Sequence, residues 1–258
     1  MTRRTGVGLG TIVVLALAWY VLTTLTGAIS GGRFPSPQEL WLALRQALTT
    51  GYADATLLVH ALHSLRLVVS GFLVAIAVGV PLGLLMGWSR RAEALINPVF
   101  LLIRPIPPLA WIPLAILWLG LGDGAKIMVI FFAAFVPSVI NTATGVRNIE
   151  PAMIEAAQML GTRRVRFVLE VLFPAALPMI FTGLRLSLQA SWTTLVAAEL
   201  VGALAGLGRV LNVAQQDIFP AMILVGMLAV SILGWGTTRI LAMAEGRVMP
   251  WLNVEGGR

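Results

Sequence analysis

Long uncharged runs of apolar residues are the feature that most restricts how this chain can fold. A helix needs about 20 mostly apolar residues to cross a bilayer, and its backbone must satisfy its own hydrogen bonds there. Six segments meet that length, at residues 7–29, 65–88, 96–119, 127–146, 178–201 and 221–244. We therefore predict an all-α integral membrane protein with six transmembrane helices, forming a single membrane domain over residues 1–258.

The composition excludes most soluble classes of protein. Hydrophobic residues make up 58% of the chain and charged residues 11%, against about 25% charged in a soluble domain. The net charge of +7 is dispersed between the apolar runs, so it does not predict a nucleic-acid partner. The chain has no cysteine and only two histidines, which excludes thiol chemistry and a histidine metal cluster. We expect the lipid bilayer to surround it and no metal site within it.

Basic residues are divided unequally between the two sides of the predicted spans. Eleven arginines fall in loops on one side, and three arginines with Lys126 fall on the other. Because basic loops remain in the cytoplasm, this bias predicts cytoplasmic termini and a cytoplasmic segment 147–174. The loops at residues 30–64, 120–126 and 202–220 are then expected to face outward. Since the first apolar run continues past any cleavage site, we expect an uncleaved span rather than a signal peptide.

Small residues repeat along one face of the second span. They stand four residues apart, at Gly71, Ala75, Gly79, Gly83 and Gly87. Small residues at this spacing let helix backbones approach closely inside a bilayer. The stripe predicts close helix packing, either within the chain or between two copies of it.

Prolines interrupt the third span. Four prolines follow Arg104 within nine residues, the last of them at Pro113. This segment therefore cannot form a straight helix. Backbone groups freed by the break must face protein or a wet cavity. A charged side chain inside a span is costly, so Arg104 predicts a translocation path or an ion pair, unless it extends to the membrane surface.

The cytoplasmic segment 147–174 has the pattern of two short helices joined by a turn. Pro151 suits the first turn of a helix, and Gly161 suits a helix end. A second stretch with helical spacing begins at Arg163, and Phe173–Pro174 is expected to end it. Such an exposed helix-turn-helix fits the groove of a partner protein, or is a connecting loop without a partner.

Residues 155–174 also carry a specific motif. They read Glu155-Ala156-Ala157, three residues, Gly161, nine residues, Val171, one residue, and Phe173-Pro174. This resembles the EAA motif of ABC-importer permeases, E-A-A-x3-G-x9-I-x-L-P, with apolar replacements at two positions. The resemblance implies the type I importer permease fold. It also implies that a partner ATPase docks on this loop, at Glu155, Ala156, Ala157, Gly161, Arg163 and Arg164.

Further segments resemble the nitrate/sulfonate/taurine group of these permeases. They are Arg104–Pro113, Gly120–Ile127, Gly183–Leu186, Thr194–Leu200 and Gly206–Gly208. The last two are most similar to taurine permeases. The resemblance implies a bacterial inner-membrane importer with two permeases, two ATP-binding subunits, and a periplasmic or surface-tethered substrate-binding protein. A single permease chain of this group commonly pairs with itself, and a heterodimer with a second permease is the alternative.

The sequence does not predict that this chain hydrolyses ATP. A phosphate-binding loop needs G-x4-G-K-[S/T], whereas Lys126, the only lysine, follows Ala125 and precedes Ile127. We therefore expect a non-catalytic subunit with no cofactor of its own, and we expect ATP and magnesium to bind the partner ATPase.

The fifth span carries a stripe of polar and aromatic residues. Arg185, Gln189, Trp192, Val196 and Glu199 are spaced by four, three, four and three residues, which places them on one helical face. Ionisable residues within a span mark a functional site or a fixed ion pair. We expect the stripe to line the translocation path, with Arg185 attracting an anion and Glu199 acting at the outer gate or meeting an amine.

The predicted function is import of a small anion, with taurine or another aliphatic sulfonate first and nitrate, bicarbonate or an aromatic carboxylate as alternatives. An ion-coupled secondary transporter would need inverted repeats, which we do not find in the sequence. An intramembrane serine hydrolase would need His60 or His63 beside Ser64 or Ser70, but no acid stands with them in a span. We expect these residues to form a polar cluster at the outer end of the second span.

Overall fold

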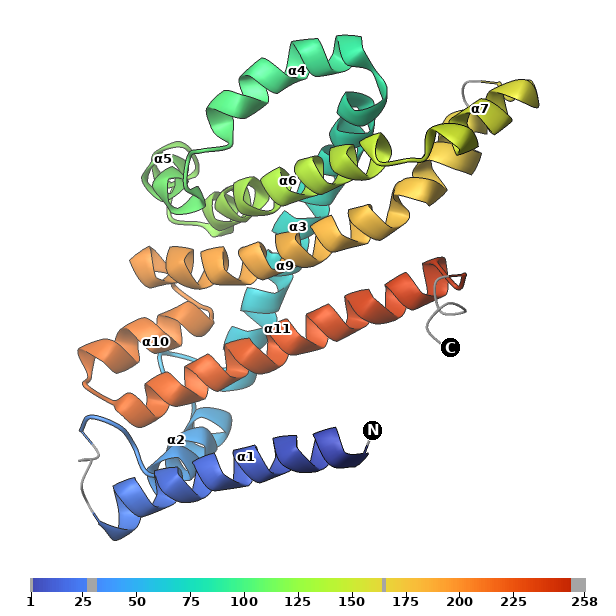
Figure 1. The fold of residues 1–258 in the computed structure, drawn as a ribbon. Coiled ribbons are helices and arrows are strands. Elements are labelled where there is room, and N and C mark those ends of the chain that lie inside the picture. The colour runs from blue at the N-terminus through green and yellow to red at the C-terminus, as the bar shows by residue number, and fades with distance from the viewer. Residues whose placement is uncertain (1, 27–31, 164–165, 252–258) are drawn as a thin grey trace. The chain divides into compact units, whose positions relative to one another are not determined.

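The computed structural model describes residues 2–26, 32–163 and 166–251. These residues are largely helical, and a bridge between Tyr52 and Ala55 is the one extended pairing among them (Figure 1). The elements in chain order are α1 (Thr2–Tyr20), η1 (Val21–Leu25), α2 (Pro37–Thr49), α3 (Leu57–Trp88), α4 (Arg90–Ile103), η2 (Pro108–Trp111), α5 (Ile112–Leu119), α6 (Asp123–Arg147), α7 (Pro151–Met159), η3 (Phe167–Leu172), α9 (Phe173–Gly202), α10 (Leu207–Gln216) and α11 (Pro220–Val248).

Four helices within the described residues are long and apolar enough to cross a membrane. They are α3, α6, α11 and the continuous stretch Phe167–Gly202, which joins η3 to α9. The apolar part of the first predicted span, Val13–Leu25, is shorter, and positions 27–29 of that prediction lie outside the described residues. The all-helical membrane fold is confirmed, while the count of six crossings stays a prediction.

The third predicted span is not one helix. It is divided into α4 and the η2–α5 pair, which meet at 83° and together are long enough for a fifth crossing. Pro107, at the start of η2, has extended backbone, and a proline cannot donate the hydrogen bond that would continue α4. The prolines therefore predicted the break, and α4 begins at Arg90, before the approximate start of the predicted range 96–119.

Contacts within the chain separate it into two compact units. One comprises Met1–Ser64 with Ala203–Ile232, and the other comprises Leu65–Gly202 with Leu233–Arg258. The divisions fall inside α3 and α11, so both helices contribute to both units. In the first unit, α2 starts with a capping box, in which Ser36 and Glu39 bind each other's backbone N–H groups.

In the second unit, the glycine face of α3 packs against α6. A Cβ atom added at any of the four stripe glycines would come within 2.5–2.9 Å of an α6 side chain. The contacts advance in step along both helices, from Gly71 beside Ile130 to Gly87 beside Val146, so the two helices run parallel. Of the two uses predicted for the small-residue stripe, the structure therefore favours packing within the chain.

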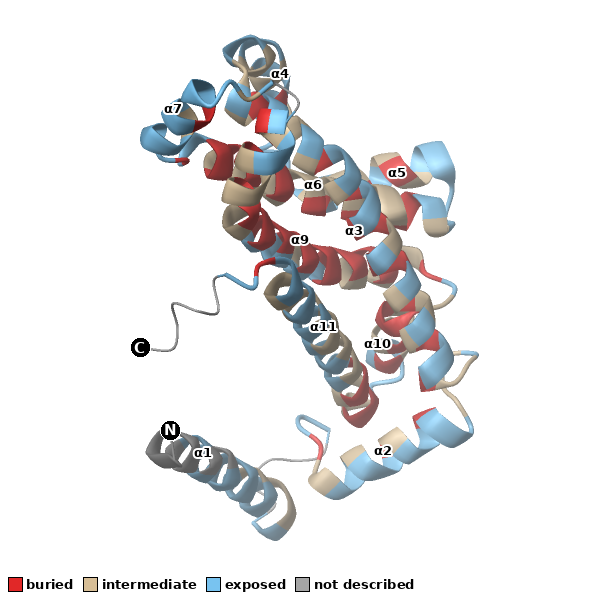
Figure 2. Cartoon of the chain, turned by 90° about the vertical axis from the view of Figure 1, so that its right-hand side faces the viewer, coloured by how far each residue is buried: buried red, intermediate tan, exposed pale blue. Residues whose placement is uncertain are grey.

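A neighbouring face of α6 is covered by α9, which runs antiparallel to it. Gly183 lies against Asn141, and the Ser187 hydroxyl donates to the Ala134 carbonyl at 2.6 Å. Figure 2 shows buried residues concentrated along α6 and α9. Because α6 packs between α3 and α9, it is the central helix of this unit.

Candidate coupling loop and translocation path

Helix α7 has sequence signals at both of its ends. Pro151 lies in its first turn, where a missing N–H group costs nothing. At the other end Gly161 has a φ of 66°. Its N–H donates to the Gln158 carbonyl at 3.0 Å, and the Thr162 N–H donates to the Ala157 carbonyl at 3.2 Å. This pair of bonds is a Schellman motif, so α7 begins and ends where the sequence predicts.

The motif residues of α7 lie mostly on the surface. Glu155 and Ala156 are exposed, whereas Ala157 is buried. The end of the helix is apolar and still more exposed, with Met159 at 89% and Leu160 at 85%. Exposed apolar side chains that adjoin one another are typical of a surface that contacts a partner.

The second helix of the loop differs from the prediction. Arg163 is exposed, and Arg164 lies outside the described residues. From Phe167 the chain forms a π-helix, η3, that continues directly into α9. The prediction that Phe173–Pro174 ends this helix was wrong. A proline is tolerated where the hydrogen-bond register changes, and the wide turns of the π-helix change that register just before it.

The start of η3 is anchored on the end of α3. The rings of Phe167 and Trp88 have centroids 4.7 Å apart, and Phe167 and Leu172 are both buried. The loop is thus joined to α9 through a packed helical segment.

The predicted stripe of α9 divides between two environments. Arg185 and Gln189 are exposed, whereas Trp192 and Glu199 are buried, Glu199 to 1% exposure. The stripe is therefore continuous along the helix in sequence, but it is not one exposed face of this chain.

Two residues of α11 bind the stripe, and sequence reasoning missed both. The Trp192 Nε1 donates to the Thr237 hydroxyl at 3.0 Å, and Arg185 forms an ion pair with Glu245. Gly234 lies beside the Trp192 ring, and a Cβ atom added there would make an ordinary contact with that ring at 3.8 Å. One indication of the Arg185–Glu245 pair was present in the sequence, because both residues fall near the cytoplasmic ends of predicted spans and so at a similar depth in the membrane.

Arg104 stands at the bend between α4 and η2. Its backbone N–H donates to the Phe100 carbonyl at 2.9 Å and ends the helix, and its side chain is exposed. The break at the prolines therefore leaves the Arg104 guanidinium group at the bend between α4 and η2.

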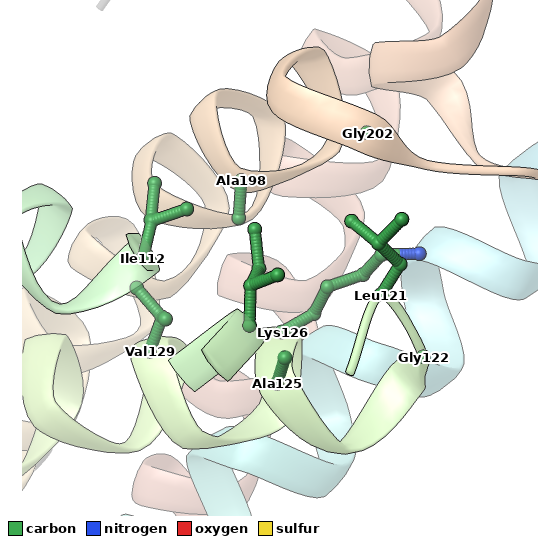
Figure 3. A pocket seen from close by; sticks show the side chains of 9 residues that line it. Ile112, Leu121, Gly122, Ala125, Lys126, Val129, Ala198 and Gly202 are labelled. Carbon is green, nitrogen blue, oxygen red and sulfur yellow. The ribbon is translucent and has the colours of Figure 1, made fainter. Parts of the chain in front are cut away.

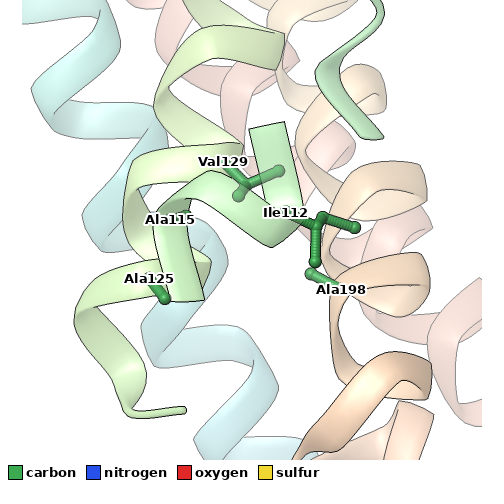
Figure 4. Close-up of a cluster of buried hydrophobic side chains, with 5 residues drawn as sticks. All are labelled: Ile112, Ala115, Ala125, Val129 and Ala198. Atoms are coloured by element: carbon green, nitrogen blue, oxygen red, sulfur yellow. The ribbon is translucent and has the colours of Figure 1, made fainter. Parts of the chain in front are cut away.

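A small, mostly apolar pocket lies where α5, α6 and α9 meet (Figure 3). Its lining residues are Ile112, Ile116, Leu121, Gly122, Ala125, Lys126, Val129, Ala198 and Gly202. Several of them belong to a buried cluster with Ala115 (Figure 4). Lys126 is only 7% exposed, and its Nζ lies 3.7 Å from an Asp123 oxygen. The sequence placed this lysine in an outer loop and did not indicate its burial.

The polar residues at the start of α3 form the expected cluster. The His60 Nδ1 accepts from the Gly206 N–H at 3.1 Å, and its Nε2 donates to the Tyr52 carbonyl at 3.0 Å. The Ser64 hydroxyl accepts from the Leu207 N–H at 2.8 Å. These bonds satisfy N–H groups at the start of α10 that have no partner within the helix. In a serine hydrolase the histidine would instead take the proton of the serine.

In this first unit, side chains also join the loop between α2 and α3 to both ends of α10. The Tyr52 hydroxyl donates to the Asp217 carboxylate, and Arg209 forms an ion pair with Asp54 at 2.9 Å. Burial raises the pKa of the Tyr52 phenol well above its usual value, and the bond to Asp217 and its negative charge raise it further. At neutral pH Tyr52 is therefore a dependable donor.

The family model for the inner membrane component of binding-protein-dependent transport systems matches residues 79–249. This chain belongs to that family. The matched residues include α7, its Schellman motif and all of α9.

Relatives extend the match to nearly the whole chain. It is 35% identical to the taurine transport system permease protein TauC of Escherichia coli K12, over 97% of this chain and 91% of the relative. It is 33% identical to the nitrate import permease protein NrtB of Synechocystis, over 93% of this chain and 87% of the relative. A putative aliphatic sulfonates permease of Bacillus subtilis is 32% identical, over 95% of this chain and 87% of the relative. The chain is thus an ABC transporter permease of the nitrate/sulfonate/taurine group.

A solved structure shares the fold. A chain of the MetNI methionine ABC transporter, in an inward-facing conformation, matches with a TM-score of 0.59 and 21% identity. The match covers 81% of this chain and 98% of that chain. The predicted importer permease fold is therefore confirmed.

Proposed function

We propose that the importer built around this permease carries taurine or another aliphatic sulfonate. The observation that supports this most is the 35% identity with TauC over 97% of the chain. The relatives' names refer to taurine, aliphatic sulfonates and nitrate, and all three molecules present negatively charged oxygen atoms. The exposed guanidinium groups of Arg104 and Arg185 suit such oxyanions.

The chain acts as a non-catalytic subunit whose coupling surface is α7 and the turn after it. Glu155, Ala156 and Gly161 are exposed there, beside the apolar Met159 and Leu160. A partner ATPase binds ATP and magnesium, docks on this surface and transmits its motion through η3 to α9. The exposed Arg163 extends the docking surface, and Arg164, which follows it in the motif, is proposed to contact the same partner.

The translocation path lies along α9 and at the bend beside Arg104. Arg185 and Gln189 provide its exposed polar part, while Trp192 and Glu199 form the buried part nearer the outer end. Two copies of the chain enclose the path, two ATPases drive it, and a binding protein delivers substrate from outside. Both termini face the cytoplasm.

The test is reconstitution of the complete complex with its binding protein in proteoliposomes. We expect taurine to stimulate ATP hydrolysis and to be taken up, and native mass measurement to find two permease copies. Nitrate, bicarbonate and benzoate are assayed in parallel. Stimulation by nitrate but not by taurine would overturn the sulfonate assignment in favour of nitrate, the second candidate, which the 33% identity with NrtB supports.

A further inference from the structure

The ion pair between Arg185 and Glu245 joins α9 to α11 at the predicted cytoplasmic end of the path. The Arg185 side chain is 47% exposed and the Glu245 side chain 19% exposed, so the acid is the more enclosed partner. Two turns away, the bond from Trp192 to Thr237 joins the same two helices. A second contact between the same two helices therefore stands beside the pair.

The chemistry of this pair matches that of the proposed cargo. A guanidinium group has five N–H donors in a planar fork, and one carboxylate uses at most a few of them. A sulfonate, a nitrate or a bicarbonate presents charged oxygens that fit the same fork. The carboxylate of Glu245 thus binds the N–H donors of Arg185 that a transported oxyanion would also use.

We infer that Glu245 is an internal competitor for the oxyanion at Arg185, and that it promotes release of the substrate toward the cytoplasm. The inference rests on the proposed function. An arginine near the apolar interior with no acid beside it would hold an anion strongly, because few other groups there balance its charge. A carboxylate that returns to Arg185 lowers the apparent affinity in proportion to the time it occupies the arginine. Glu245 is a positioning residue in this scheme, since it acts through Arg185.

The test measures taurine uptake by the complete complex in proteoliposomes, separating KM from kcat. If Glu245 occupies Arg185 about 90% of the time, Glu245→Gln lowers KM about tenfold. We expect kcat to fall as well, since release slows. Arg185→Gln should raise KM, and the double variant should keep the raised KM because the arginine is gone.

Thr237→Val is the matched control. It removes the bond from Trp192 to Thr237 between α9 and α11 without changing any charge, so it tests whether a contact between these helices acts only by holding them together. We expect it to leave KM unaltered. If it reproduces the effect of Glu245→Gln, or if the double variant recovers wild-type kinetics, the pair is only a clamp and the inference is overturned.

Two further outcomes are distinguishable. Should Glu245→Gln not assemble, Glu245→Asp keeps the charge on a shorter side chain and is expected to lower KM to a smaller degree, whereas an unchanged KM would reject the competitor. A wild-type complex that takes up neither taurine nor nitrate would contradict the proposed function itself. Wild-type uptake combined with unchanged KM in the Glu245 variants contradicts this inference alone.

Discussion

Glu199 is a buried acid within an apolar helix, and its neighbours on α9, Ala198 and Gly202, line the pocket shared with α5 and α6. An ionisable group inside a span is expensive to keep, which is why it indicates function. Sequence reasoning found this residue by its depth and spacing alone. It could not find the burial of Lys126 beside the same pocket, because that depends on how three separate segments pack.

We predict that Glu199→Gln lowers uptake by about tenfold or more while the complex still assembles, since the amide keeps the size of the side chain but loses the charge. Uptake and copurification of the ATPase are measured on the same preparation. Glu199→Asp, which keeps the charge, should retain more transport. A well-expressed Glu199→Gln complex with normal uptake would remove this acid from the mechanism.

Tyr52 gives a pH dependence at the same scale. Its pKa is raised in the folded chain, so the protonated phenol is favoured by folding. Its contribution to stability is complete below the ordinary phenol pKa of about 10 and is lost as the pH rises above that value. We predict that thermal stability of the purified permease falls more steeply above this pH for wild type than for Tyr52→Phe. Parallel curves for the two proteins would refute the role of the Tyr52–Asp217 bond.

At the scale of elements, the sequence predicted what local rules control. Apolar length located α3, α6, α9 and α11, the prolines located the bend after α4, and Pro151 with Gly161 located α7. It was wrong at Phe173–Pro174, where a stop signal was overridden because η3 and α9 form one packed helix. Contacts such as that between Arg185 and Glu245, which are 60 residues apart, leave no periodic trace in the sequence.

The α3–α6 seam allows a sharp comparison between two glycines. At Gly83 an added Cβ would lie 2.6 Å from the Thr142 Cβ and 2.8 Å from the Val139 carbonyl, whereas at Gly236 in α11 it would meet nothing within 4 Å. We predict that Gly83→Ala destabilises the permease by about 1–3 kcal/mol through overpacking. Gly236→Ala should be neutral or stabilising by up to about 1 kcal/mol, because alanine favours the helix. Thermal unfolding in detergent compares them, and equal effects would contradict the close packing of the seam.

At the scale of the whole molecule, the two ends of α9 adjoin different candidate sites. One end continues from η3 and the coupling loop, and the other carries Glu199 beside the pocket. Because α6 packs along α9 through contacts such as Gly183 with Asn141, the helix cannot bend freely between these ends. In the proposed function, this packing is what would let a docking event at the loop affect the path.

The proposed coupling surface is shaped by the backbone turn at Gly161. Its φ of 66° is strained for residues with a side chain, yet no atom of the described residues lies within 4 Å of an added Cβ. Among these residues, a substitution therefore acts through the backbone. We predict that Gly161→Val, with a strain of about 1–2 kcal/mol, opens the Schellman motif and misplaces α7. The spans should still insert, while uptake and substrate-stimulated ATP hydrolysis fall together. Gly161→Asn is the matched control, because asparagine tolerates this conformation and should retain most coupling. A Gly161→Val complex that assembles and transports normally would show that this loop does not transmit the power of ATP hydrolysis.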